Sequence, residues 1–325
     1  MKKTALAYSN IALIKYWGKV DFTNRLPANN SISMNLSNLK TITTVEFQPQ
    51  LKKDDVLIDG AKVDKEIIRV KKHLDRIRKI NNTLLFAKVV SQNNFPKSTG
   101  LSSSASGFAA LTLAATSGLN LNLSENKLSH LARLASGSAC RSIPGGFVEW
   151  YQSTSRHDSF AKTIFPDSYW NIVDFVAVVG GQKKDISTSF AQRSAFSSPF
   201  LKVRLKNLPS KLKYLKLAIE EKNFPVFGEI IEAEALEMHA IIMTQARPLI
   251  YFLPETLALF RQVRMWRLEG LLVFFTLNTG HDVHLFCQEK DKDILNKKLT
   301  LLPFVKRIII NYPAGKAAII NKHLF

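Results

Sequence analysis

Apolar residues recur along this chain with two spacings, and each spacing predicts one kind of element. Runs that are apolar throughout, or at alternate positions, indicate strands, because successive side chains of a strand point to opposite faces. Such runs cover residues 4–14, 41–47, 83–91, 147–152, 172–179, 271–277, 283–287 and 305–310, and another strand follows residue 31. The run 55–58 precedes Asp59-Gly60, a pair typical of a hairpin turn. Residues 153–170 are polar and indicate an exposed loop.

Apolar residues three or four positions apart predict helices over the remaining segments. These cover about 64–80, 102–118, 124–135, 224–243 and 255–269, with a further short helix before the last strand. Pro199 suits the first turn of a helix, and Pro209 predicts a break before a longer helix that runs to about residue 222. The chain therefore reads as an α+β protein whose second half is mostly helical.

Composition and charge narrow the class of protein. The 325 residues are 46% hydrophobic, apolar runs such as Leu271–Leu277 are too short to span a bilayer, and Asn10 and Lys15 interrupt the only segment that resembles a signal peptide. Two cysteines, Cys140 and Cys287, supply neither a disulfide framework nor zinc-ligand spacing. We therefore expect a cytoplasmic protein without a membrane partner.

The net charge of +19 suits nucleic acid, an anionic membrane or small anionic substrates. Basic residues are densest between Arg69 and Lys79, where an apolar stripe of helical spacing runs through the same segment. This pattern favours an amphipathic helix with a solvated basic face. Because no nucleic-acid-binding motif accompanies it, we expect no nucleic-acid partner.

A loop rich in small residues leads into a helix at Asn93–Leu111. Asn93, Pro96 and Gly100 form loops, and three serines at 102–104 occupy the helix start. The N–H groups there suit a phosphate, and the hydroxyls add donors or ligands for a magnesium ion that bridges phosphates. The alternative is a helix cap with close packing. The segment is not a Walker A loop, because no Gly-Lys-Ser/Thr follows its glycines.

The string Pro-Lys-Ser-Thr-Gly-Leu-Ser-Ser-Ser-Ala-Ser-Gly at residues 96–107 resembles the P-x-x-x-G-L-x-S-S-A motif of the GHMP kinases. In that superfamily the loop wraps the triphosphate of ATP. The resemblance implies ATP and Mg²⁺ as cofactors, with Ser104 as a magnesium ligand and catalytic residue. The implied ATP-binding residues are Asn93, Pro96, Gly100, Leu101, Ser102, Ser103 and Ser104.

Two further stretches narrow the resemblance to the diphosphomevalonate decarboxylases, a branch of the GHMP kinases. Asn-Ile-Ala-Leu-Ile-Lys-Tyr-Trp-Gly-Lys at 10–19, followed by Leu-Pro-x-Asn-x-Ser-Ile-Ser, is similar to their opening. Gly-Ser-Ala-Cys-Arg-Ser at 137–142, followed by Gly-Gly-x-x-x-Trp, is similar to their second diagnostic stretch. The resemblance implies a substrate site formed by Lys15, Tyr16, Lys19, Arg69, Ser136, Ser138 and Arg141, in which Lys15 and Arg141 are also catalytic.

Three more residues near this implied site need an interpretation, which stays open for two of them. Lys183 and Lys184, in a Lys-Lys-Asp-Ile-Ser run, either contact the substrate or form a solvated turn. Cys140 reads as a packing residue, because no histidine is placed to activate it and its family counterpart is not catalytic.

One stretch departs from the family pattern. Asn278-Thr-Gly-His-Asp282 stands where the family carries Asp-Ala-Gly-Pro-Asn, so Asn278 takes the place of the catalytic aspartate. An amide cannot accept a proton, and general-base help is typically worth about 10²–10⁴-fold in rate. Three interpretations are open: Asp282 supplies the carboxylate instead, Asn278 suffices to position the hydroxyl of the substrate, or the protein is a weakly active or repurposed member. Asp282 also reads as a turn residue.

The resemblance covers nearly the whole chain, and it implies a GHMP fold. An N-terminal ribosomal-protein-S5-like domain (1–183) and a C-terminal ferredoxin-like domain (184–325) would enclose a cleft. The implied reaction is ATP-dependent decarboxylation of mevalonate 5-diphosphate to isopentenyl diphosphate, in a homodimer of the mevalonate pathway. The alternatives are a kinase that phosphorylates the 3-hydroxyl without decarboxylation, and an inactive basic ligand-binding relative.

Overall fold

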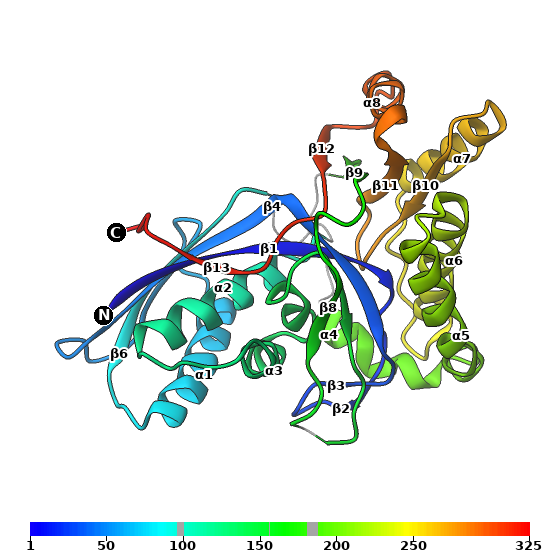
Figure 1. The fold of residues 1–325 in the computed structure, drawn as a ribbon. Coiled ribbons are helices and arrows are strands. Elements are labelled where there is room, and N and C mark those ends of the chain that lie inside the picture. The colour runs from blue at the N-terminus through cyan, green and yellow to red at the C-terminus, as the bar shows by residue number, and fades with distance from the viewer. Residues whose placement is uncertain (96–100, 156, 181–187) are drawn as a thin grey trace.

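The computed structural model describes residues 1–95, 101–155, 157–180 and 188–325, and it has the predicted α+β architecture. A large sheet covered by three helices forms one part of the molecule, and a smaller sheet with longer helices forms the other (Figure 1). The predicted domain boundary between residues 183 and 184 lies outside the described residues and stays a prediction. No helix among the described residues has the length and apolar character needed to cross a membrane.

The large sheet contains seven strands in the described part of the chain, in the order β13-β1-β4-β6-β5, with β7 and β8 added beside β4. The predicted first strand is confirmed as β1, and its buried end delivers Lys15 to the centre of the molecule. The strands are β1 (Lys2–Ile14), β4 (Ser31–Gln48), β5 (Asp55–Ile58), β6 (Phe86–Asn93), β7 (Phe147–Trp150), β8 (Ala161–Phe165) and β13 (Ala318–Ile320), with β2 (Lys19–Asp21) and β3 (Leu26–Pro27) forming a separate pair.

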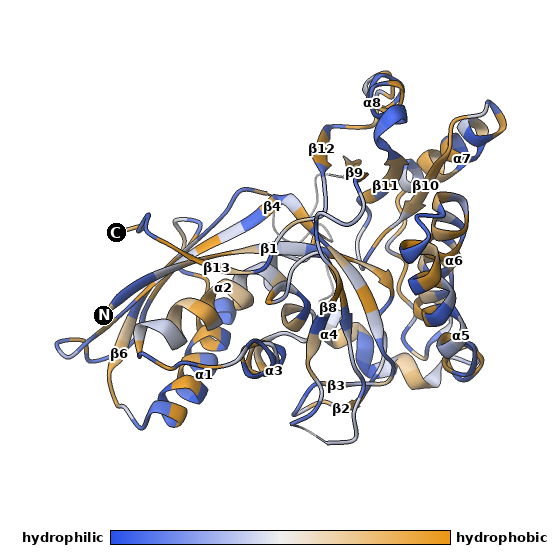
Figure 2. Cartoon of the chain, in the orientation of Figure 1, coloured by the Kyte–Doolittle hydropathy of each residue, from blue (hydrophilic) through white to orange (hydrophobic). Residues whose placement is uncertain are grey.

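Three helices and a 3₁₀ turn pack against the large sheet: α1 (Asp64–Asn81), α2 (Ser103–Gly118), α3 (Glu125–Ala135) and η1 (Gly137–Ser142). The central helix α2 is apolar over most of its length and presents alanines to the sheet, which lets its backbone approach closely (Figure 2). In contrast, α1 buries Val70, Leu74 and Ile77 and leaves much of its basic face exposed, which confirms the predicted amphipathic helix.

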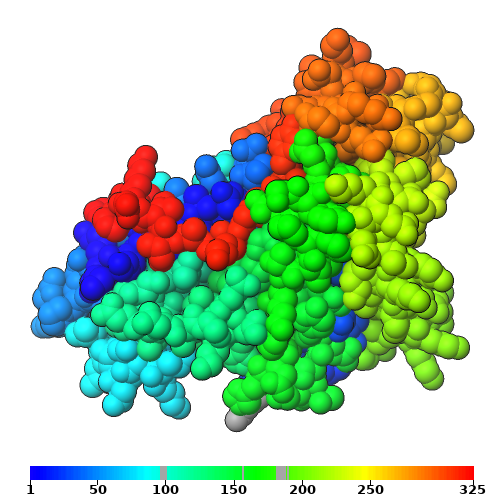
Figure 3. All heavy atoms as spheres, viewed as in Figure 1, coloured from blue at the N-terminus to red at the C-terminus, as the bar shows by residue number. Residues whose placement is uncertain are grey.

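The smaller sheet has the order β10-β11-β9-β12 among the described residues, with all its pairs antiparallel. Its strands are β9 (Ile172–Val178), β10 (Val273–Thr276), β11 (Val283–Gln288) and β12 (Arg307–Asn311). Its helices are α4 (Thr188–Ala191), α5 (Leu201–Glu220), α6 (Phe224–Thr244), α7 (Pro254–Leu268) and α8 (Lys292–Thr300), with the 3₁₀ turns η2 (Gln192–Ser197) and η3 (Glu289–Asp291). The chain then returns to the large sheet, where its last strand lies against β1 (Figure 3).

Two details differ from the sequence prediction, at Pro209 and in the loop 153–170, and a third, the turn after β5, agrees with it. Helix α5 continues through Pro209, because Leu208, Leu212 and Leu215 on its buried face outweigh the hydrogen bond that proline removes. The predicted turn at Asp59-Gly60 is confirmed, because Ile58 and Ala61 exchange backbone hydrogen bonds of 3.0 and 3.1 Å across it; α1 then returns the chain so that β5 pairs parallel with β6. The predicted loop 153–170 contains β8, which pairs with β7.

Candidate active site

A polar cleft of about 1190 Å³ gathers most of the predicted site residues. Its walls come from the end of β1, the start of α2, helix α1, the turn η1 and the segment after β10. These segments lie far apart in sequence, so the fold itself brings the three family stretches together. The predicted residues that line the cleft are Lys15, Tyr16, Lys19, Arg69, Ser102, Ser103, Ser104, Ser136, Ser138, Arg141 and Asn278.

The start of α2 presents serine hydroxyls to this cleft. Ser102 has the left-handed backbone angle φ 56°, which is uncommon for a residue with a side chain. The Ser104 hydroxyl lies 3.3 Å from that of Ser136. Leu101 is buried, and its carbonyl accepts a 2.6 Å hydrogen bond from the Ser9 hydroxyl. The predicted loop residues Pro96 and Gly100 lie outside the described residues.

A second, more apolar pocket of about 580 Å³ adjoins the cleft, and the two share Ser103, Ser104, Glu66 and Arg69. Asn93 lies in this second pocket rather than in the cleft. Its amide nitrogen donates to Asp59 at 2.9 Å and its oxygen accepts from Thr41 at 2.6 Å. The other lining residues are mainly apolar side chains of β5, β6, α1 and α2: Ile58, Val70, Val89, Phe108 and Leu111.

Three buried donors of cleft-lining residues have no hydrogen-bond acceptor among the described residues: the Nε of Arg141, the Tyr16 hydroxyl and the indole N–H of Trp17. Arg141 is 3% exposed; it donates to the Ser31 hydroxyl at 2.7 Å and the Asn10 amide oxygen at 3.3 Å, while its Nε donates to nothing. The Tyr16 hydroxyl is also unpaired, and its ring packs edge-on against Trp150. Buried unpaired donors are costly, so their presence points to an anionic ligand that accepts from them.

The amine of Lys15 is almost completely buried at the floor of the cleft. It donates to the Ala12 carbonyl at 2.5 Å and to the Thr276 hydroxyl at 2.7 Å. Burial lowers its pKa to about 7, and the opposing attraction of Glu234 is smaller than that loss of hydration.

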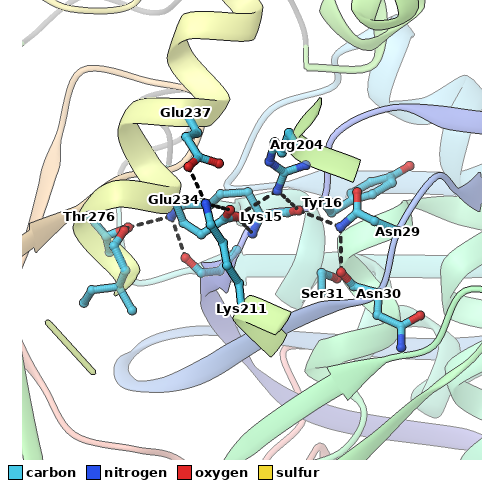
Figure 4. A network of polar contacts seen from close by, with 12 residues as sticks. Lys15, Tyr16, Asn29, Asn30, Ser31, Arg204, Lys211, Glu234, Glu237 and Thr276 are labelled. Carbon is cyan, nitrogen blue, oxygen red and sulfur yellow. Dashed lines mark hydrogen bonds and ion pairs between the residues drawn. The ribbon is translucent and has the colours of Figure 1, made fainter. Parts of the chain in front are cut away.

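Helices α5 and α6 hold the backbone of Lys15 through a buried ion pair (Figure 4). Glu234 accepts from the Lys15 backbone N–H at 3.0 Å and from Arg204 at 2.8 Å, and Arg204 donates to the Lys15 carbonyl at 2.9 Å. Lys211 adds a 3.3 Å contact to the same carboxylate. The sequence analysis missed Arg204, Glu234 and Thr276, because each stands alone in an apolar or basic helix or strand without a motif around it.

Lys19 lies in a more cationic part of the cleft. Burial, followed by repulsion from Arg25, Arg193 and Arg69, lowers its pKa to about 8. Arg69 itself lies over the Phe108 ring and donates to the Ala135 carbonyl at 3.4 Å. Arg25, which the sequence analysis also missed, lines the cleft and donates to the Leu134 carbonyl at 3.0 Å. Such a concentration of cations suits a polyanion.

Asn278 lies where both parts of the molecule meet. Its amide oxygen accepts from the Ala12 backbone N–H at 3.4 Å, and its amide nitrogen donates to the Ser102 hydroxyl at 3.1 Å. Its carbonyl meets the His239 ring nitrogen at 3.1 Å. The side chain of Asn278 therefore connects the end of β1 to the start of α2.

Asp282 does not line the cleft. Its carboxylate accepts from the Val179 backbone N–H at 3.2 Å, beyond the end of β9, and Asp282 is 3% exposed.

The thiol of Cys140 is fully buried and donates to the Gly137 carbonyl at 3.0 Å. Burial raises its pKa to about 12, so the thiol is not poised as a nucleophile. Lys183 and Lys184 lie outside the described residues.

Two family descriptions match almost the whole chain. Residues 7–161 match the diphosphomevalonate decarboxylase-like N-terminal domain, and residues 174–311 match the mevalonate 5-diphosphate decarboxylase C-terminal domain. Diphosphomevalonate decarboxylase of Candida albicans is 32% identical over 90% of this chain and 85% of its own length. The human diphosphomevalonate decarboxylase is 31% identical over 96% of this chain and 81% of its own length.

Solved structures agree with these sequence matches. The mevalonate diphosphate decarboxylase from Enterococcus faecalis has a TM-score of 0.91 and 34% identity, over 99% of both chains. A structure of MDDEF in complex with MVAPP, AMPPCP and magnesium has a TM-score of 0.92 and 35% identity, again over 99% of both chains. The predicted GHMP kinase fold is therefore confirmed.

Proposed function

Because the chain belongs to the diphosphomevalonate decarboxylase family, we propose that it converts mevalonate 5-diphosphate to isopentenyl diphosphate at the expense of ATP. The tertiary hydroxyl oxygen attacks the γ-phosphorus, and the bond from that phosphorus to ADP breaks. The new phosphate ester then leaves with its carbon–oxygen bonding pair. Loss of CO₂ supplies the electron pair of the new double bond, so the products are ADP, phosphate, CO₂ and the alkene.

One observation carries the proposal: the three family stretches converge on a single cleft whose buried donors lack an acceptor. Lys15 and Tyr16 from the first stretch meet Ser136 and Arg141 from the second across the start of α2. The unpaired Nε of Arg141 and hydroxyl of Tyr16 suit the carboxylate and diphosphate of this substrate. We assign Lys15, Tyr16, Lys19, Arg69, Ser136, Ser138 and Arg141 to substrate binding on this basis.

The residues at the start of α2 suit a nucleotide triphosphate with Mg²⁺. Serine hydroxyls line the cleft there at the N-terminus of a sixteen-residue helix, whose first N–H groups have no acceptor within the helix, and Arg69 lines it beside the single carboxylate of the described lining, Glu66. Mg²⁺ is usually held by few protein oxygens together with phosphates and water, so the Ser104 hydroxyl is a suitable ligand. When bound, the ion neutralises charge that develops on the phosphates.

The apolar pocket beside the cleft suits the nucleoside of ATP. It shares Ser103 and Ser104 with the cleft, so a triphosphate can run from one space into the other. Phe108 and Leu111 offer apolar surface to a base, and Asn93 lies at the same pocket. We therefore propose that Asn93 and Leu101 support the nucleotide from the second pocket and the loop before α2.

We propose that Asn278 acts by position. Its amide holds the end of β1 against Ser102, which fixes Lys15 and the start of α2 relative to each other. Phosphoryl transfer depends mainly on positioning and electrostatics, so a neutral side chain is compatible with it. A homodimer and a cytoplasmic location stay predictions.

The test supplies the purified protein with ATP, Mg²⁺ and mevalonate 5-diphosphate and follows ADP and isopentenyl diphosphate together. Equal amounts of both are expected. ADP without the alkene would identify a 3-hydroxyl kinase, and neither product would contradict the proposed function. Asp282→Asn is the matched variant, because its amide oxygen can still accept from Val179. We expect it to retain activity; complete loss in a folded variant would instead make Asp282 the relocated carboxylate.

A further inference from the structure

We infer that Lys15 is the general base of this enzyme: its uncharged amine takes the proton of the substrate's tertiary hydroxyl, and the amide of Asn278 leaves the amine free to do so. The inference rests on the proposed function and adds the identity of the proton acceptor. Four features of the cleft support it, namely the set of available bases, the contacts of the amine, the charges around it and the nature of the side chain at position 278.

Few groups in the cleft can accept a proton. Among the described residues that line it, Glu66 carries the only carboxylate, and it lies on α1, where it also borders the apolar pocket. The amide of Asn278 is not basic, and the arginines stay charged. Burial raises the pKa of Tyr16, so its phenol keeps its proton. Glu66 has its charge opposite the guanidinium of Arg69, whose charged form it favours, so Lys15 and Lys19 remain as candidate bases.

The contacts of Lys15 match an uncharged amine. An amine has two N–H bonds and one lone pair, whereas an ammonium has three N–H bonds. The Ala12 carbonyl accepts one N–H, and the Thr276 hydroxyl accepts the other, because that hydroxyl gives its own proton to the Ile231 carbonyl at 3.2 Å. These two contacts leave the third position of the nitrogen without a partner among the described residues, and because Lys15 lines the cleft, the lone pair of an uncharged amine would occupy that position beside a ligand.

The burial of Lys15 also disfavours an ammonium. Burial removes the hydration of the charged amine, and Arg141 from η1 and Arg204 from α5 repel it, so its pKa falls to about 7. Glu234 from α6 attracts it, but that carboxylate is already bonded to Arg204, Lys211 and the Lys15 backbone. His239, also from α6, is uncharged at neutral pH, because burial lowers its pKa to about 3.

The side chain at position 278 decides whether Lys15 can stay neutral. Asn278 shares Ala12 with Lys15, since it accepts from the backbone N–H of Ala12 while Lys15 donates to the carbonyl of Ala12. A carboxylate at this position would stabilise an ammonium on Lys15, because opposite charges favour ionisation. An amide has the same shape without the charge. Lys19 differs, since it lies among Arg25, Arg69 and Arg193 and so suits a polyanion.

The proton balance of the step is complete. The hydroxyl proton moves to the Lys15 nitrogen as the oxygen forms its bond to the γ-phosphorus and the bond to ADP breaks. Lys15 becomes an ammonium beside the new phosphate ester, which it stabilises as that ester leaves. The ammonium of Lys15 gives its extra proton to solvent after the products leave, which restores the uncharged amine.

The first experiment compares the pH dependence of single-turnover ADP formation in the wild type and in Asn278→Asp. The wild-type rate should rise with pH as one group loses its proton. In Asn278→Asp the introduced carboxylate is itself the base. The midpoint of the rise in rate should therefore move to lower pH by at least about one pH unit. An unmoved rise in the variant would overturn the inference, because the rate would then depend neither on a new base at position 278 nor on the charge of Lys15 beside it.

The second experiment separates base chemistry from binding. Lys15→Met keeps the length of the side chain without its nitrogen, and the single-turnover rate should fall by about 10²–10⁴-fold. Calorimetry should show that the variant still binds ATP-Mg²⁺ and mevalonate 5-diphosphate. Lys19→Met, the matched control, should weaken substrate binding and keep the wild-type pH dependence. Normal turnover in Lys15→Met would overturn the inference, whereas an inactive wild type would instead contradict the proposed function.

Discussion

The two walls of the cleft are built in different ways. The N-terminal wall (residues 15–19, 102–104 and 136–141) consists of short continuous stretches that bring hydroxyls and cations to the ligand. The C-terminal wall (Arg204, Glu234, Thr276 and Asn278) consists of single residues spread over three elements and a loop. Asn278 lines the cleft itself, and the other three contact Lys15 from behind the lining. The first wall supplies the groups that bind anions. The second fixes the backbone, contacts and protonation of one of those groups, Lys15.

The largest expected effect comes from breaking the buried pair of the C-terminal wall. Glu234→Gln leaves Arg204, whose side chain is 2% exposed, without its carboxylate. Removing one partner of a buried pair typically costs about 3–5 kcal/mol in the free energy of unfolding. Urea denaturation measures the loss.

A double variant, Arg204→Leu with Glu234→Leu, should recover most of that free energy because no buried charge is left unpaired. The exposed pair of Lys62 and Asp55 provides the control, since Lys62→Ala should cost less than about 1 kcal/mol. A Glu234→Gln loss as small as the Lys62→Ala loss would show that the C-terminal wall does not depend on its buried charges.

The N-terminal wall should respond in affinity rather than in stability. Arg141→Lys keeps the charge and loses the planar fork, so substrate binding should weaken by about 10–100-fold, as expected for charge-assisted hydrogen bonds worth ~1.5–3 kcal/mol. Calorimetry with mevalonate 5-diphosphate measures this loss of affinity. Arg133→Lys is the matched control: Arg133 is buried on α3, donates to the Ser159 carbonyl and lies outside the cleft lining. Equal weakening in both variants would refute a direct role for Arg141.

Two buried histidines, one in each part, should make the fold sensitive to acid. Burial lowers the folded-state pKa of His73 and of His239 to about 3, from about 6.5 in the unfolded chain. The unfolded state therefore binds more protons between these values, and the free energy of unfolding falls as pH falls through about 6.5. The slope is at most about 1.4 kcal/mol per pH unit for each histidine.

His73→Leu and His239→Leu should each reduce this slope, which denaturant titrations between pH 7 and pH 4 will show. Slopes that stay at the wild-type value in both variants would exclude these histidines as the acid-sensitive groups. A slope that changes only for His239→Leu would assign the acid sensitivity to the part of the molecule with the smaller sheet.

The smallest effect is expected from crowding the N-terminal wall. A Cβ at position 137 would lie 2.9 Å from the Tyr16 ring and 3.2 Å from Trp150, so Gly137→Ala should displace Tyr16. We expect up to about a tenfold rise in KM for mevalonate 5-diphosphate and a stability loss of about 1 kcal/mol. Gly107→Ala is the control, because a Cβ there meets no atom within 4 Å. An unchanged KM in Gly137→Ala would argue against a substrate contact by Tyr16.

The two walls also differ in how much of them could be predicted from the sequence. Lys15, Ser104 and Arg141 stand in continuous motifs, so the residues that line the cleft were readable before the fold was known. Arg204 and Glu234 lie on separate helices, and only tertiary packing brings them to the Lys15 backbone. Likewise, a lysine's pKa depends on burial, which no motif encodes.

The fold shows the same limit. Strand and helix patterns located most elements, but Pro209 reads as a break and lies inside a helix. The short strand β8 was hidden in a polar segment, because only its pairing with β7 makes it a strand. The local sequence pattern predicts an element well where the element's own apolar residues stabilise it. It predicts an element poorly where pairing with a segment distant in the sequence stabilises it.

The central claim is that burial keeps Lys15 uncharged in the working enzyme and that the amide at position 278 preserves this state. The most direct test is NMR titration of lysine side chains in isotope-labelled, ligand-free protein, with Lys15→Arg to assign the signal. The account predicts that Lys15 titrates near pH 7 and that Asn278→Asp raises its midpoint. A wild-type midpoint near the ordinary lysine value of about 10.4 would contradict it.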